Sequence, residues 1–243
     1  MKLIAGILVS SMIFLTLSFY PLSIPTFRTS KSTFNNEQLY TADSNYYYAG
    51  WMLYSAKSGV KADITTVDFQ GPLPPFPQSR HAAGYINVYL SSNPLYWIQT
   101  GYVKRAWWIW LIFFPIPVWT SDFYVETNDA SGWHLNYVGK PSAGVTYTYT
   151  LMYFNEYFWI AAIFLGSIQV YATLVPVSPN TPNGLYVGVE TTHQSVIIDG
   201  SHFSDISYYQ GGSWVHWSTH STFYDYPYRI NSVSPYEFYA YNG

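Results

Sequence analysis

From Tyr46 onward the chain is a succession of short runs rich in aromatic and β-branched residues, separated by turn residues. The run 46–56 leads through a Lys-Ser-Gly turn into the run 60–70, and a Ser-Asn-Pro turn joins the runs 82–92 and 95–103. No amphipathic helix, internal repeat or low-complexity block stands between them. Runs of this length at roughly 8 to 12 residue spacing are typical of all-β proteins. We therefore predict about ten to fourteen strands in a two-sheet antiparallel β-sandwich of the concanavalin or jelly-roll kind.

Charged residues are scarce, at 9% of the chain, whereas 21% of the residues are aromatic. Large flat side chains pack well across neighbouring strands, which supports the β prediction. With a net charge of −3 and ten scattered Lys and Arg residues, the chain has no basic patch that would attract the phosphate backbone. Nucleic acid is therefore not an expected partner. Few carboxylates also means few groups whose protonation unfolds the chain in acid. The composition suits an acidic environment, and it equally suits a Tyr-rich surface protein at neutral pH.

The first twenty residues, MKLIAGILVSSMIFLTLSFY, are one lysine followed by an uncharged apolar stretch. This pattern predicts a secretory signal peptide or an uncleaved membrane anchor at residues 1–20. Residues 21–45 are Ser-, Thr- and Asn-rich and are interpreted as a linker, followed by the β-sandwich domain at 46–243. We therefore expect an extracellular or cell-surface protein, monomeric, with a membrane tether through residues 1–20 if that segment is not cleaved.

Two long apolar stretches of the chain are compatible with either a core strand or a segment that contacts a membrane. Ala106–Trp119 is too short to span a bilayer and contains two prolines. It predicts either a buried strand or an exposed apolar loop, and burial in the core is favoured; an exposed segment could contact lipid or bind peptides. Tyr157–Val177 carries no charge over 21 positions, but a Gly-Ser pair divides it into two strand-length halves. It is interpreted as a β-hairpin rather than a membrane helix.

Several kinds of catalytic site find no support in the sequence. The chain has no cysteine, which excludes disulfides, thiolate metal sites and a cysteine nucleophile. Among the six histidines, His216 and His220 have the i, i+4 spacing of some metal ligands. In strand-rich sequence that spacing does not bring two side chains together, so no metal and no cofactor is expected. Motifs of serine hydrolases, phosphate-binding loops and zincins do not occur either.

Three polar residues within strand-like sequence are candidates for a site. In YWIQTGYVKR, alternation places Gln99 on one face with Trp97 and Val103. A solvent-facing glutamine, or one satisfied inside a core, would give the same pattern. Glu126 in FYVETND and Glu190 in LYVGVETTH also lie in strand-like runs, whereas most other carboxylates lie in turns. Glu190 shares its face with Tyr186 and Gly188, and we expect room for a ligand above the glycine.

The order of these short signatures resembles the glutamic endopeptidases of the eqolisin type and their prokaryotic relatives. The matching segments are YYAGWML, ITTVDFQGPLP, WIQTGYV with Gln99, DFYVETND with Glu126, and LYVGVET with Glu190. The resemblance implies a secreted acid endopeptidase on a two-sheet β-sandwich, with Gln99 and Glu190 as its catalytic pair. We expect the polypeptide substrate to be lined by the following residues: Trp51, Trp97, Glu126 and Tyr186.

The resemblance also implies a mechanism. Glu190 would take a proton from the attacking water and return it to the leaving amine. A glutamate near its ordinary pKa of about 4.3 can act as base and then acid at about pH 3 to 4. Gln99, which does not titrate, would hold the water and donate to the developing oxyanion. This mechanism requires the two side chains to lie close enough to share one water.

Other functions fit the same composition. The main alternative is a non-catalytic extracellular surface or carbohydrate-binding β-sandwich, with aromatic residues as stacking platforms. A thermopsin-like acid peptidase shares the Tyr- and Trp-rich strands. A glycoside hydrolase would use Glu126 and Glu190 as its carboxylate pair, separated by about 5 to 9.5 Å.

Overall fold

The computed structural model describes residues 46–73, 79–92, 95–111, 113–178 and 180–243, and its regular structure in these ranges is entirely β. The signal or anchor and the linker expected at residues 1–45 lie outside the described residues. Within the described ranges no helix is long and apolar enough to cross a membrane. The strands in chain order are β1 (Tyr47–Leu53), β2 (Gly59–Thr65), β3 (Arg80–Ser92), β4 (Leu95–Leu111), β5 (Phe114–Asp129), β6 (Gly132–Gly139), β7 (Thr146–Asn155), β8 (Phe158–Leu165), β9 (Ile168–Pro176), β10 (Gly184–Thr191), β11 (Ser201–Gln210), β12 (Ser213–His216), β13 (Ser221–Tyr224), β14 (Tyr228–Ser234) and β15 (Glu237–Asn242).

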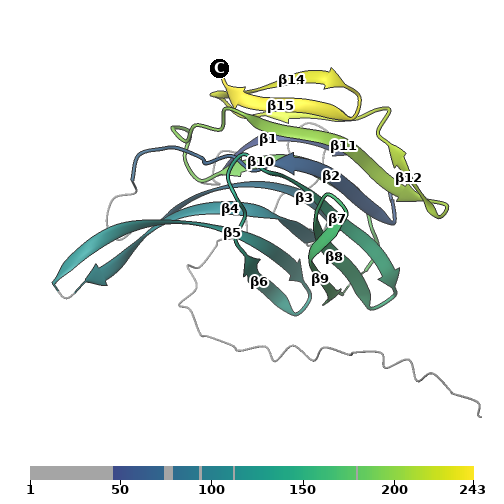
Figure 1. Ribbon diagram of the computed structural model, residues 1–243. Helices are drawn as coiled ribbons and strands as arrows, with labels where there is room; N and C mark the ends of the chain where they lie inside the picture. The colour runs from purple at the N-terminus through teal and green to yellow at the C-terminus, as the bar shows by residue number, and fades with distance from the viewer. Residues whose placement is uncertain (1–45, 74–78, 93–94, 112, 179) are drawn as a thin grey trace, which may run out of the picture. The chain divides into compact units, whose positions relative to one another are not determined.

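The strands form two antiparallel sheets (Figure 1). The seven-stranded sheet has the order β13-β1-β10-β3-β4-β5-β6. The eight-stranded sheet has the order β14-β15-β11-β2-β7-β8-β9, with β12 paired to β11 beside this path. The two-sheet antiparallel β-sandwich predicted from the sequence is confirmed.

Alternate residues of each sheet point inward and form one core between the sheets. On β10 the inward residues are Leu185, Val187 and Val189, all nearly or fully buried. Large aromatic side chains fill most of the remaining space, among them Trp51, Trp159, Phe203 and Phe238. Each such side chain contributes about 1.5–3 kcal/mol on burial, so the buried aromatic residues stabilise the fold together with the aliphatic ones.

The outer face of the seven-stranded sheet, turned away from the eight-stranded sheet, carries a second, smaller apolar cluster. Its buried members are Met52, Ala83, Tyr85, Tyr89, Val103, Tyr124 and Tyr186. The Tyr186 ring lies over two glycines, and a Cβ added at Gly188 would approach the Tyr186 hydroxyl to 2.4 Å. The space expected for a ligand above Gly188 is therefore filled by Tyr186, and that expectation was wrong.

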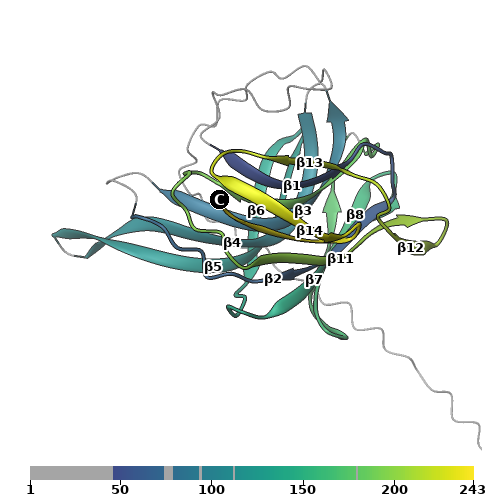
Figure 2. The ribbon, with the colours of Figure 1, turned by 90° about the horizontal axis from the view of Figure 1, so that it is seen from above.

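The two apolar stretches of the sequence differ in whether the structure agrees with their predicted conformation. Tyr157–Val177 forms the hairpin of β8 and β9, which turns at Gly166 with φ +58°, as predicted. Ala106–Trp119 does not enter the core. It forms the far ends of β4 and β5, which run together beyond the other strands in both views (Figures 1 and 2). The core interpretation of this segment was wrong, because no third strand of the part of the chain that the structure describes pairs with its middle residues.

Candidate active site

Gln99 lies on the outer face of the seven-stranded sheet, between two polar cross-strand neighbours. The register places Asn87 of β3 opposite Gln99 of β4, and Gln99 opposite Glu126 of β5. Gln99 Nε2 donates to Glu126 Oε2 at 2.9 Å, and Asn87 Nδ2 donates to Gln99 Oε1 at 3.2 Å. Gln99 is only 8% exposed. The three residues form a short hydrogen-bonded row across three strands, which fixes the orientation of the Gln99 amide.

The Glu126 carboxylate is held by a second donor from the next strand. Trp133 Nε1 of β6 donates to Glu126 Oε1 at 2.6 Å. Part of Glu126 reaches solvent, but its carboxylate is enclosed by protein, and this desolvation raises the pKa of Glu126 to about 7. The bonds from Trp133 and Gln99 oppose the rise only in part. Glu126 is therefore protonated in acid, and neither of these two partners is an acceptor for the added proton.

Glu190 forms a separate polar centre on the same face. Its strand β10 pairs with β3, and Glu190 lies opposite Ala83, four residues from Asn87. Four residues correspond to about 13 Å along a strand. His81 Nε2 lies 3.1 Å from Glu190 Oε1, and the Glu190 side chain is 16% exposed. Across the described ranges no hydrogen bond joins Gln99 to Glu190; the carboxylate that Gln99 contacts is Glu126.

The two carboxylates nevertheless act on one another. The charge of Glu190 adds to the rise in the pKa of Glu126, after burial. Both charges also contribute, again after burial, to a raised pKa of Tyr46 and of Tyr124. Since the charge of Glu190 acts on Glu126, Tyr46 and Tyr124 alike, the four groups lie in one region.

Two buried polar atoms beside Gln99 lack hydrogen-bond partners among the described residues. They are Asn87 Oδ1 and Trp97 Nε1. A buried polar group without a partner costs about 1–3 kcal/mol, so such atoms are suited to receive polar groups of a bound ligand. One is an acceptor and the other a donor, which matches the two polar groups of a peptide bond.

The residues expected to line the substrate are distributed over both faces. Trp97 and Glu126 share the outer face with Gln99. Tyr186 also lies there, level with Asn87, but it is fully buried. Trp51 points the other way, into the core between the sheets, and stacks on His220 at 3.7 Å between ring centroids. Trp51 therefore cannot contact a ligand at Gln99, and the expectation that it lines the substrate was wrong.

Sequence reasoning missed Asn87, Trp133 and His81 as members of these polar centres. Alternation within GYINVYL places Asn87 on the same face as Tyr85, but only the pairing of β3 with β4 brings it to Gln99. Trp133 reaches Glu126 from β6, and His81 reaches Glu190 from β3. These contacts depend on which strands are neighbours, and short motifs do not give that information.

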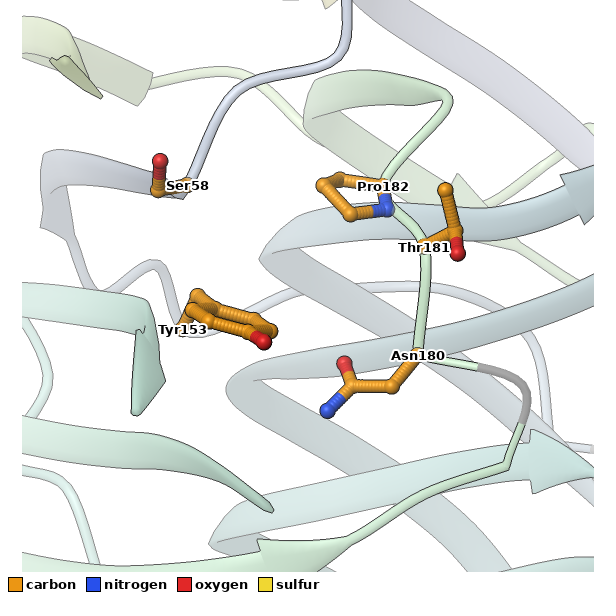
Figure 3. Close-up of a pocket in the computed structure, with 5 residues that line it drawn as sticks. All are labelled: Ser58, Tyr153, Asn180, Thr181 and Pro182. Carbon is orange, nitrogen blue, oxygen red and sulfur yellow. The ribbon is translucent and has the colours of Figure 1, made fainter. Parts of the chain in front are cut away.

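A shallow pocket of about 210 Å3 has none of the residues of the two polar centres in its lining (Figure 3). It is lined by Ser58, Tyr153, Asn180, Thr181 and Pro182. These residues include no carboxylate and no histidine, so the pocket lacks a group suited to proton transfer near neutral pH. No cluster of three or more potential metal ligands occurs in the described part of the chain.

The fold is similar to that of solved glutamic peptidases. A structure of scytalido-glutamic peptidase with a transition-state analogue inhibitor matches with a TM-score of 0.59 at 12% sequence identity, covering 84% of this chain and all of the other. SCP-B, a member of the eqolisin family solved with the tripeptide Ala-Ile-His, matches with a TM-score of 0.56, also at 12% identity and with the same coverage. No family model and no curated protein matches the sequence. At this identity the similarity establishes the shared fold.

Proposed function

We propose that the protein is an acid-active endopeptidase that hydrolyses peptide bonds on the outer face of the seven-stranded sheet. The observation that carries the proposal is the hydrogen-bonded pair of Gln99 and Glu126, at 2.9 Å, within a fold shared with glutamic peptidases. The fold neighbours supply the reaction class, and the polar row supplies residues able to perform it. The proposed place of action is outside the cell, on the basis of the apolar segment at residues 1–20.

The proposed roles divide proton transfer between two carboxylates. Glu126, protonated in acid, donates to the scissile carbonyl oxygen, because its partners Gln99 and Trp133 are both donors and leave the proton available. Glu190, whose charge acts on the Glu126 carboxyl, takes a proton from the attacking water, which the substrate must hold between the two polar centres. Collapse of the tetrahedral intermediate returns one proton to Glu126 and passes the proton on Glu190 to the leaving amine. The reaction consumes one water and leaves both carboxyl groups in their starting states.

Gln99 orients Glu126 and assists the developing oxyanion. One Nε2 hydrogen binds Glu126, and the other is directed to the Tyr124 hydroxyl over a longer distance of 3.3 Å. A substrate oxygen can replace this weaker bond. The Gln99 donor then works alongside the Glu126 proton at the same carbonyl oxygen. This assignment differs from the sequence-based expectation, in which Glu190 alone carried both proton transfers.

The pH dependence of proteolysis tests the proposal. Because Glu126 must be protonated and its pKa is about 7, the rate should be highest in acid and decline about tenfold for each pH unit above about 7. The measurement is cleavage of an unfolded protein by the purified full chain from pH 2 to 8, with new termini identified by mass spectrometry. Absence of cleavage throughout this range would favour the carbohydrate-binding sandwich. Cleavage of a glycan but not of protein would favour the glycoside hydrolase.

A further inference from the structure

The far ends of β4 and β5 form a two-stranded arm with no charged residue from Ala106 to Trp119. β3 pairs with β4 only as far as Ala106, and β6 pairs with β5 only from Phe123 onward. Beyond these points β4 and β5 pair with each other and with no other strand of the described ranges. Isolated two-stranded ribbons are marginally stable in water, so an apolar ribbon of this kind requires a further contact.

Exposure of the arm increases toward its tip and occurs on both faces. Phe113 and Phe114 at the tip are 80% and 72% exposed, whereas the side chains nearer the domain are exposed by 36–40%; these are Trp107, Ile109, Ile116 and Trp119. Ile109 and Ile116 pair on one face, and Trp119 lies on the other. A peptide groove would be apolar on one face only. Apolar residues on two faces and the largest exposure at the tip fit insertion into a surrounding apolar medium.

The edge of the arm is unsuited to pairing with another strand. Pro115 and Pro117 lie on β5, opposite Trp110 and Trp108. Proline has no N–H group, and within a sheet it is tolerated where the missing donor faces the free edge. Two prolines in alternate positions remove donors that a second copy of the chain would need for edge-to-edge association. They also reduce the number of unpaired N–H groups that would have to enter lipid.

The base of the arm carries groups suited to a lipid headgroup layer. Arg80 pairs with Ala106, and Lys104 and Arg105 directly precede the arm on β4. Lys104 is buried and pairs with Asp68, and Arg105 pairs with Asp122, so the excess among these groups is the single positive charge of Arg80. Tryptophans stand at the same level, at positions 107 and 119, where a membrane interface favours them. From Trp107 to the end of β4 the strand rises about 14 Å, half of a bilayer hydrocarbon core of about 30 Å.

We propose that this arm docks onto a phospholipid bilayer, with Phe113 and Phe114 inside one leaflet and Trp107 and Trp119 at the headgroup level. The arm does not span the bilayer. It holds the outer face of the sheet close to the membrane surface, independently of any anchor at residues 1–20. The partner is the lipid itself rather than a protein, because the proline-marked edge and the two apolar faces suit a fluid apolar phase.

The test uses a fluorescent probe at the tip of the full chain. Because the chain has no cysteine, Phe114→Cys provides one unique site for an environment-sensitive label, and Ser232→Cys on β14 of the other sheet provides the matched control. Vesicles of phosphatidylcholine, with and without phosphatidylglycerol, are added. We expect the label at position 114 to shift to shorter wavelength with at least a twofold rise in intensity, and to be quenched by a nitroxide within the bilayer. The label at position 232 should not respond.

A second variant separates tip insertion from binding through another segment. Adding Phe113→Asp to the labelled protein should raise the lipid concentration for a half-maximal response at least about tenfold, because a charge is costly in the apolar layer. Unchanged thermal unfolding would show that the domain remains folded. A silent label at position 114 on vesicle-bound protein would overturn the proposal, since the chain would then be held elsewhere. A response to peptide substrate but not to vesicles would also overturn it and assign the arm to substrate binding.

Discussion

Glu126→Gln is expected to reduce acid proteolysis by a factor of about 10³ or more, close to the limit of detection. Removing the carboxyl removes the proton that the account assigns to the scissile carbonyl oxygen. The amide can still accept one hydrogen bond from Gln99 or Trp133, so the local geometry should persist. The loss should therefore appear in kcat with little change in KM, measured with a quenched peptide or an unfolded protein at about pH 4.

The same variant should gain stability at high pH. Burial raises the pKa of Glu126 from 4.5 to about 7, so its contribution to stability is complete below pH 4.5 and is lost as pH rises through about 7. The raised pKa corresponds to ~3 kcal/mol lost in the parent by about pH 8. Glu126→Gln avoids this loss, although one weakened hydrogen bond offsets about 1 kcal/mol. Urea unfolding should show the variant more stable than the parent at pH 8, and no more stable at pH 4.

Glu237→Gln is the matched control for both measurements. Glu237 lies on β15 of the other sheet and pairs with His202 at 3.0 Å, as Glu190 pairs with His81. It should leave proteolysis within about twofold of the parent. If Glu126→Gln retained most of its activity while Glu190→Gln lost it, the two proton transfers would both belong to Glu190, as the family resemblance implied.

Gln99→Ala should lower kcat by about 10² to 10³, the range for removal of one oxyanion donor. It also removes a hydrogen bond that orients the Glu126 carboxyl and leaves the Asn87 amide without its acceptor. The effect should therefore exceed that of a surface change. Gln169→Ala on the exposed strand β9 is the control and should be neutral. A Gln99→Ala protein with parental kcat would remove Gln99 from the chemistry and leave it a structural role.

Alternation and turn residues were enough to predict the sandwich, because both are local properties of the chain. They also placed Gln99 with Trp97, and Glu190 with Tyr186, on the correct faces of their strands. Alternation and turn residues could not predict that Gln99 contacts Glu126. That contact depends on β5 lying beside β4 at a register that sets Glu126 opposite Gln99. Short motifs favoured Glu190 as the catalytic partner of Gln99. Glu190 lies two strands away from Gln99, and its register position is offset by four residues along the strands.

The two wrong burial predictions have a common physical cause. Trp51 and the segment Ala106–Trp119 are both strongly apolar, and hydrophobicity alone does not say which face or which end of a strand meets a second sheet. Trp51 faces the second sheet and is buried, whereas β4 and β5 are longer than the strands beside them. The arm is exposed because it extends past its neighbours, a property of relative strand length rather than of its own composition.

A structure of the protein with a peptide-based transition-state analogue tests the central claim most directly. Such an analogue places a hydroxyl group where the oxyanion forms. We expect this hydroxyl within about 2.6–3.2 Å of both the Glu126 carboxyl and Gln99 Nε2, with a second polar group of the analogue facing Glu190. An analogue bound with its hydroxyl away from Gln99 and Glu126, or bound on another face of the domain, would contradict the assignment of this pair as the catalytic centre.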